Sequence, residues 1–164
     1  MDIPVDTRPV RSDDGPLFCR LWDRLSPETI YRRFHAPLRH PPADARRLVE
    51  VDHDLREALV AVVGGEVVGV ARYDRSPVDP TTADVAVVVE DAWQGVGVGR
   101  HLLTELTELA ARRGVRRLTA DVQADNGRMV GLVRRLLPGA VLTPAHGVYA
   151  VQSPLTSAPV PAAA

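Results

Sequence analysis

The chain of 164 residues contains no lysine, and its 20 basic residues are all arginine. A Walker A phosphate-binding loop ends in Gly-Lys-Ser or Gly-Lys-Thr, so a nucleotide site of that type is excluded. Cysteine is nearly absent as well. The single Cys19 cannot form an intramolecular disulfide, and a lone thiol is typical of a reducing compartment.

Metal-binding and membrane-spanning patterns are also missing. The five histidines are scattered, and neither an HExxH nor a CxxC motif occurs, so we expect no metal site. The chain has no stretch of about 18 apolar residues and no apolar signal region at its start, so we expect a cytoplasmic protein. Its net charge is −1, which gives no overall attraction to nucleic acid or to a membrane surface.

The hydrophobic pattern predicts one α/β domain over residues 1–152, followed by a Pro- and Ala-rich tail, 153–164, that we expect to be disordered. Leucines at helical spacing follow the capping sequence Ser12-Asp13-Asp14, and Ile30, Tyr31 and Phe34 follow a second capping sequence, Ser26-Pro27. The expected strands are 3–10, 58–63, 66–73, 84–89, 117–122, 140–143 and 148–152, and the expected helices begin near 14, 27, 43, 97 and 126.

A glycine-rich turn lies between an apolar strand and a helix, in the order Gln94, Gly95, Val96, Gly97, Val98, Gly99, Arg100. Such a turn directs several backbone N–H groups at one point beside the positive end of a helix dipole, which favours a phosphate or pyrophosphate. A dinucleotide fingerprint, G-x-G-x-x-G, does not fit, because Arg100 occupies its last glycine position. The pattern Q-x-x-G-x-G does fit.

This Q-x-x-G-x-G turn resembles the pyrophosphate loop of the GNAT acyltransferase superfamily, and the order of predicted elements is similar to the GNAT order over residues 3–152. Residues 25–34, 51–54 and 58–61 resemble the GNAT domain of bacterial protein lysine acetyltransferases. The resemblance implies a GNAT fold, with a mixed, mostly antiparallel sheet of about seven strands flanked by helices and splayed between the fourth and fifth strands.

The same resemblance implies that acetyl-CoA is the co-substrate. Its pantetheine arm would pair with the backbone of Val87, Val88 and Val89, and its pyrophosphate would lie on the amides of residues 95–100. Asn126 resembles a residue that contacts the pantetheine side in this family, and it equally fits a plain helix cap. Arg100 could add positive charge to a phosphate or simply face solvent. An ordinary sheet without a gap is the alternative at the fourth strand.

Direct acyl transfer to an amine needs a base, since a lysine acceptor with a pKa near 10.4 arrives mostly charged. Related protein acetyltransferases carry a glutamate at the tenth position before the loop glutamine, where this chain has Asp84. Aspartate is one methylene shorter, so a bridging water would have to span the difference. Glu90 shares strand parity with Asp84 and is the second candidate. Asp91 is another alternative.

Three functions remain open from the sequence. The first is acetylation of a protein lysine, for example on an acyl-CoA synthetase. The second is acetylation of a small cationic amine, for which Asp52, Asp54 and Glu57 could form an acidic cleft. The third is a non-catalytic acyl-CoA-binding module. The sequence does not distinguish a monomer from a homodimer, nor does it fix the acyl chain length or the acceptor.

Overall fold

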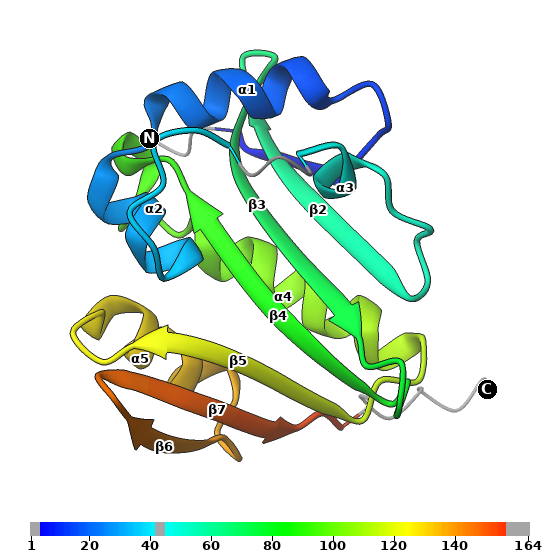
Figure 1. Ribbon diagram of the computed structural model, residues 1–164. Coiled ribbons are helices and arrows are strands. Elements are labelled where there is room, and N and C mark those ends of the chain that lie inside the picture. Colours follow the sequence, from blue (N-terminus) through cyan, green and yellow to red (C-terminus); the bar gives the residue numbers. More distant parts are fainter. Residues whose placement is uncertain (1–3, 42–44, 157–164) are drawn as a thin grey trace.

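The computed structural model describes residues 4–41 and 45–156. A seven-stranded sheet passes through it in the order β1-β2-β3-β4-β5-β7-β6, with helices against both faces (Figure 1). Neighbouring strands are antiparallel except β4 and β5, which are parallel. This mixed, mostly antiparallel α/β sheet confirms the predicted fold.

The strands and helices have the following bounds. The strands are β1 (Asp6–Pro9), β2 (Arg56–Val63), β3 (Glu66–Arg75), β4 (Thr82–Val89), β5 (Arg117–Gln123), β6 (Val141–Ala145) and β7 (Val148–Pro154). The α-helices are α1 (Gly15–Arg24), α2 (Pro27–Phe34), α3 (Ala45–Val49), α4 (Val98–Arg112) and α5 (Gly127–Leu136), and the short 3-10 helix η1 spans Asp91–Trp93.

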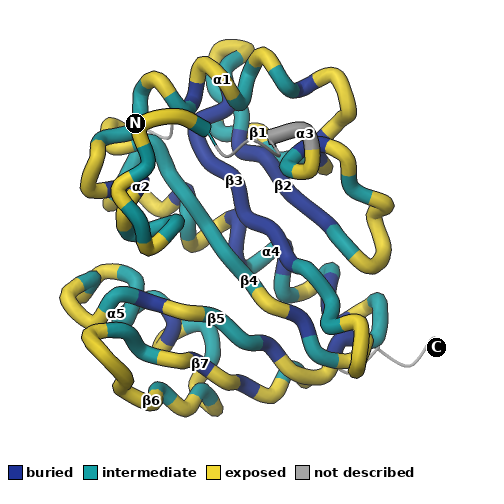
Figure 2. Tube along the Cα trace, viewed as in Figure 1, coloured by how far each residue is buried: buried dark blue, intermediate teal, exposed yellow. Residues whose placement is uncertain are grey.

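The central strands are rich in valine and alanine and are covered on both faces of the sheet. Figure 2 shows the buried residues concentrated along β2 and β3. One core cluster lies between these strands and α4, around the fully buried Leu102 and Leu106. A second lies on the opposite face, where Leu21 of α1 and Val49 of α3 pack on the sheet. A third joins β5, β7 and α5.

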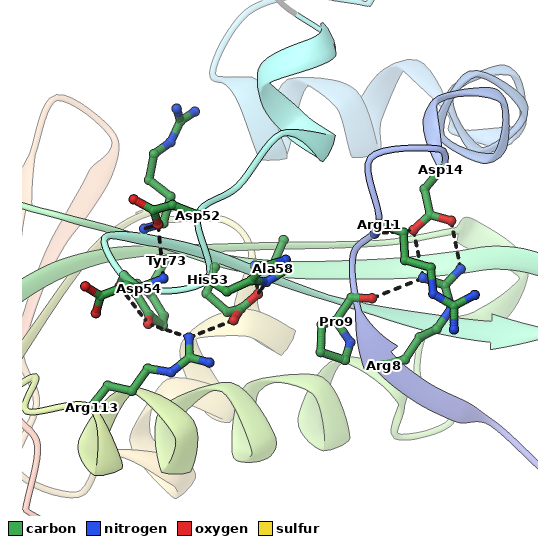
Figure 3. A network of polar contacts seen from close by, with 12 residues as sticks. Arg8, Pro9, Arg11, Asp14, Asp52, His53, Asp54, Ala58, Tyr73 and Arg113 are labelled. Carbon is green, nitrogen blue, oxygen red and sulfur yellow. Dashed lines mark hydrogen bonds and ion pairs between the residues drawn. The ribbon is translucent and has the colours of Figure 1, made fainter.

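Polar contacts tie the outer elements to this centre (Figure 3). Arg8 of β1 donates two hydrogen bonds to the carboxylate of Asp14, at 2.7 and 2.8 Å, which joins β1 to the start of α1. At the start of β2, Arg113 donates to Glu57 at 2.7 Å and to the Tyr73 hydroxyl at 3.2 Å. Glu57 is fully buried, so this pair holds the end of α4 against β2.

The sheet splits between β4 and β5. Their pairing covers only residues 82–84 against 117–119, and the last pair is Asp84 with Thr119. Beyond that pair the strands diverge, and the gap is visible in Figure 1 between the green and yellow strands. The predicted splay between the fourth and fifth strands is therefore confirmed.

Several element boundaries differ from the sequence prediction: β1 covers Asp6–Pro9 where the sequence predicts 3–10, β2 and β4 begin two residues earlier, β3 ends two residues later, and β6 covers Val141–Ala145 where the sequence predicts 140–143. Strand β7 continues to Pro154, and Ser153 is 1% exposed, so these two residues belong to the sheet and not to a tail. Residues 157–164 of the expected tail lie outside the described residues. Asp14 is the cap residue of α1 but makes no side-chain capping bond, because Arg8 and the Arg11 amide occupy its carboxylate.

Candidate functional site

A cavity of about 510 Å³ occupies the split between β4 and β5. Its lining is mostly apolar, and it also includes polar side chains such as Thr29, Gln94 and Thr119. Three predicted site residues of β4 line it: Val87, Val88 and Val89. From the turn and the start of α4, five more line it: Gln94, Gly95, Gly97, Gly99 and Arg100. Asn126, the cap residue of α5, also lines it. The structure thus brings most of the predicted cofactor residues to one cavity.

The glycine turn forms one end of this cavity. Gly95 and Gly97 have φ angles of 77° and 97°, a left-handed region that disfavours side chains, and Gly97 is the N-cap of α4. The first N–H groups of a helix have no partner within the helix. In α4 no side chain caps them either. A Cβ on Gly99 would touch the Val89 side chain at 3.5 Å. The turn therefore offers unpaired backbone donors and a positive dipole end to an anion.

Arginines add positive charge around this turn. Arg100 lines the cavity from α4 and is exposed. Arg128 of α5 also lines it, and its Nη1 lies 3.6 Å from where a Cβ on Gly95 would be. The sequence analysis missed Arg128. Its position two residues after Asn126, in the first turn of a helix that faces the cavity, was the available signal.

Two turn residues have other roles. Val98, the first residue of α4, is 4% exposed and packs in the core. Val96 is 68% exposed. Neither side chain lines the cavity. Their backbone N–H groups remain part of the turn. Asn126 caps α5, since its side chain accepts a hydrogen bond from the Met129 amide at 3.3 Å, and it lines the cavity as well.

The Gln94 side chain holds the turn in place. Its Nε2 donates to the Val89 carbonyl at 2.9 Å and to the Thr29 hydroxyl of α2 at 3.1 Å. Asp91 extends this network, because its carboxylate accepts from the Ser26 amide, the Ser26 hydroxyl and the Thr29 hydroxyl at 2.9, 2.7 and 3.0 Å. The start of α2 is thus fastened to the loop between β4 and α4.

Asp91 is consequently a structural acceptor. Burial acts to raise its pKa, but the hydrogen bonds from Ser26 and Thr29 outweigh burial and hold the pKa below its ordinary value. Glu90 is also engaged, in an ion pair with Arg24 of α1 at 3.0 Å, and it does not line the cavity. The structure brings neither of these two carboxylates to the gap.

Asp84 lies where the gap begins. It forms the last register pair between β4 and β5, and its Oδ1 accepts a hydrogen bond from Thr119 Oγ1 at 3.0 Å. Thr119 lines the cavity, and Asp84 is its neighbour just outside the lining. The residue is exposed to solvent, yet the surrounding protein desolvates its carboxylate and raises the pKa above its ordinary value.

A second carboxylate, which the sequence analysis did not single out, lies near Asp84. Asp121 lines the cavity from β5, and its negative charge contributes to the raised pKa of Asp84. In contrast, the cleft suggested from Asp52, Asp54 and Glu57 does not form at the cavity. Glu57 is fully buried against Arg113 and His53, and none of the three lines the gap.

Among the described residues, no group of three or more His, Cys, Asp or Glu side chains is placed to hold a metal ion. In the same part of the chain, every helix is too short or too polar to cross a membrane.

The sequence profile described as the acetyltransferase (GNAT) family matches residues 19–137. The chain is 38% identical over 133 residues to "Acetyltransferase Pat" of Mycolicibacterium smegmatis. That match covers 80% of this chain but 38% of the relative, so the chain spans well under half of that protein.

Solved structures show the same fold. The crystal structure of the GNAT domain of S. lividans PAT superposes with a TM-score of 0.82 at 31% identity, and the match covers 92% of this chain and 90% of that one. A putative acetyltransferase from Salmonella typhimurium, yncA, solved with its cofactor acetyl-CoA, has a TM-score of 0.74 at 21% identity, covering 98% and 99% of the two chains.

Proposed function

Because the chain belongs to the GNAT acetyltransferase family, we propose that it transfers an acetyl group from acetyl-CoA to a primary amine, and that this amine is a protein lysine. The observation that carries the proposal is the gap that opens directly after Asp84 and ends at the glycine turn. An acyl donor with an extended arm and an anionic end fits such a gap. The resemblance of residues 25–34, 51–54 and 58–61 to protein lysine acetyltransferase domains supports the protein acceptor.

The residues present fit acetyl-CoA at each end. The unpaired amides around Gly97, with Arg100 and Arg128 nearby, suit a pyrophosphate. The backbone of residues 87–89 has no β5 partner, so Val87, Val88 and Val89 can pair with an extended ligand along that edge. Asn126 stands on the opposite wall. When bound, acetyl-CoA supplies the thioester from which the acetyl group is transferred.

We assign the general base to Asp84. A lysine ammonium has a pKa near 10.4, so at neutral pH a carboxylate must remove its proton before attack. Desolvation raises the pKa of Asp84, which strengthens it as a base, and Thr119 holds Oδ1 in place by a hydrogen bond. Since aspartate is short, the proton passes through one water where the amine does not reach the carboxylate directly. Glu90 is the second candidate base, although its pairing with Arg24 occupies it.

The test compares two matched variants. A purified acyl-CoA synthetase is incubated with acetyl-CoA and with wild type, Asp84→Asn or Asp121→Asn, and its intact mass is measured over time. This chain has no lysine, so acetyl-lysine must appear on the partner. We expect Asp84→Asn to lower the rate by about 10²- to 10⁴-fold, as loss of a general base does. Asp121→Asn, the same change nearby, should retain most of the rate.

Other outcomes redirect the proposal. Full activity of Asp84→Asn would contradict the assignment. Loss of activity in Asp121→Asn or in Glu90→Gln would then assign the base to Asp121 or to Glu90, respectively. No mass gain on the protein, with acetylation of a polyamine such as spermidine, would establish the small-molecule alternative, which the two carboxylates near the gap favour. Acetyl-CoA binding without transfer to either acceptor would indicate a binding module.

A further inference from the structure

A second cavity, of about 350 Å³, lies on the face of the sheet covered by α1, α2 and α3. Of its lining residues, Arg33 and Val88 also line the gap between β4 and β5, so the two cavities adjoin there. The rest of its wall comes from elements that the proposed acetyl transfer does not use.

One buried guanidinium in this cavity is incompletely paired. Arg72 of β3 lines the cavity, and its side chain is 8% exposed. Its Nη1 is buried and has no hydrogen-bond partner among the described residues. Its Nε lies 3.6 Å from Asp74 Oδ2, but Asp74 also accepts a 3.1 Å hydrogen bond from Arg56. A single carboxylate is thus shared between two cations.

A second guanidinium adds to the positive charge. Arg33 of α2 lines the same cavity, and burial together with the nearby charge of Arg72 lowers its pKa to about 10, although the charges of Asp74 and Asp84 act in the opposite direction. Like charges that are both withdrawn from water raise the energy of the empty site. An anion between them would satisfy the free N–H of Arg72 and offset the repulsion.

The remaining wall is mostly apolar. Its largest side chains come from α1 and α2, and they are Phe18, Leu21, Trp22, Leu25 and Phe34. The acidic lining residue, Glu50, is itself exposed. The cavity therefore combines a buried, under-paired cation with an aromatic and aliphatic wall, which suits a ligand with one anionic group on an apolar body.

We propose that this cavity binds a small monocarboxylate with an apolar body, whose carboxylate accepts a hydrogen bond from Arg72 Nη1. The carboxylate has two possible sources. It belongs either to a free organic acid or to an acceptor molecule that also carries the amine to be acetylated. The second source rests on the proposed acetyltransferase function, whereas the binding itself does not.

Calorimetric titration of the wild-type protein tests the binding. The probes are 3-phenylpropanoate and its neutral isostere 3-phenylpropanamide, which share the apolar body. We expect the acid to bind at least about tenfold more tightly than the amide, because the carboxylate brings a negative charge to the guanidinium whereas the amide brings only a carbonyl dipole. Equal affinities, or no binding of the acid at millimolar concentration, would overturn the proposal.

Two variants locate the site. Arg72→Met keeps a long side chain without charge, and we expect it to remove the preference for the acid over the amide. Arg20→Met is the matched control, since Arg20 lies on α1 outside the cavity and pairs with Glu66 on the surface. A preference that survives in Arg72→Met would contradict the assignment. If Arg72→Met fails to fold, the acid–amide comparison on wild type still decides the outcome.

Incubation of L-phenylalanine with acetyl-CoA and the enzyme distinguishes the two sources. Formation of N-acetylphenylalanine that Arg72→Met abolishes would assign the carboxylate to an acceptor. Binding of 3-phenylpropanoate without acetylation of phenylalanine would assign it to a free acid. In that second case the proposed acetyltransferase function is unaffected, because the lysine assay tests it separately.

Discussion

The ionised carboxylate of Asp84 destabilises the folded protein, and the same desolvation makes it a stronger base for its proposed role. Desolvation raises its pKa, so the ionised form is less stable in the folded protein than in the unfolded chain. Above the raised pKa, Asp84 is ionised in both states and the folded state bears the full cost. Below the ordinary pKa of an aspartic acid, both states are protonated and the cost disappears.

We therefore expect Asp84→Asn to raise the Tm by about 1–3 °C at neutral pH, although it removes activity. The gain should shrink as the pH falls through the raised pKa toward the ordinary one. Thermal unfolding followed by circular dichroism across that pH range measures it. A Tm at neutral pH that is unchanged or lower in the variant would contradict the expectation.

Asp79→Asn is a control of opposite sign. Hydrogen bonds from Thr81 and Thr82 hold the pKa of Asp79 below its ordinary value, so its ionised form is favoured in the folded state. Stability from Asp79 is present above the ordinary pKa and is lost as the pH falls through the lowered one. The substitution should lower the Tm at neutral pH, and the difference should vanish in acid.

Gly97 gives a prediction about backbone conformation. Its φ of 97° is unfavourable for any residue with a Cβ, although nothing lies within 4 Å of where that Cβ would be. Gly97→Ala should cost about 1–2 kcal/mol of stability and raise the KM for acetyl-CoA, because the amides of the turn must shift. Urea denaturation and steady-state kinetics measure the two effects.

Gly131→Ala is the matched control, since Gly131 lies inside α5 at an ordinary φ with free space around it. That change should stabilise the protein by about 0.5–1 kcal/mol and leave the KM unchanged. A neutral Gly97→Ala would mean that the turn does not need its left-handed geometry.

At the residue scale, the sequence predicted which positions form the turn but not how each side chain is used. Gln94 and Asp91 are held by Ser26 and Thr29, which are far away in the chain, so no local pattern reveals those bonds. The surroundings of Glu90 likewise depend on Arg24 from α1. Asp84 could be named as a candidate base only through the family resemblance, which places a carboxylate at the tenth position before Gln94.

At the scale of elements, the attachment of α2 to the turn is expected to affect both stability and the binding of acetyl-CoA. The Asp91 carboxylate accepts three hydrogen bonds from Ser26 and Thr29. Asp91→Ala should cost about 0.5–1.5 kcal/mol of stability, since water can reach the two exposed donors but not fully the part-buried one, and should raise the KM for acetyl-CoA. Denaturation and kinetics on the same samples measure both.

Glu28→Ala is the control within the same helix. Within residues 4–41 and 45–156, the one ion pair of Glu28 is with Arg32, and its side chain is 71% exposed, so the loss should stay below about 0.5 kcal/mol. An Asp91→Ala variant that behaves like Glu28→Ala would show that the attachment of α2 contributes nothing to the cofactor end of the cavity.

Most elements were predictable because each has a clear local signal. Ser26 caps α2 through the Thr29 amide, and Gly64 and Gly65 take positive φ angles in the hairpin turn, as their sequence indicates. The end of β7 was not predictable in this way. Pro154 can continue that strand because it pairs with Arg117 of β5, a contact that only the assembled sheet provides.

At the scale of the whole molecule, strands β1 to β4 and strands β5 to β7 are joined by the short β4–β5 pairing. A donor bound in the gap would contact both groups of strands. Acetyl-CoA at about 100 times its Kd should therefore stabilise the protein by about 2.7 kcal/mol. Hydrogen exchange should slow in β4 and in the first turn of α4. Desulfo-CoA, which lacks the thiol but keeps the pyrophosphate, is the control and should retain most of this protection.

No stabilisation by acetyl-CoA at that concentration would mean that the folded protein does not bind it, and protection confined to the surface far from the gap would place the donor elsewhere. The gap itself was predictable only through the family resemblance. Nothing in the alternation of β4 or β5 specifies how far the two strands pair, since that depends on the packing of α4 and α5 behind them.

The split in the sheet also bears on solubility. Residues 85–89 are an uncharged run of valine and alanine with one unpaired side, which is the kind of segment that templates pairing between chains. Natural proteins guard such edges with charged gatekeepers. Arg32, Arg128 and Arg135 line this cavity. We expect the repulsion between these arginines on two copies to oppose pairing of this edge with another chain when no donor is bound.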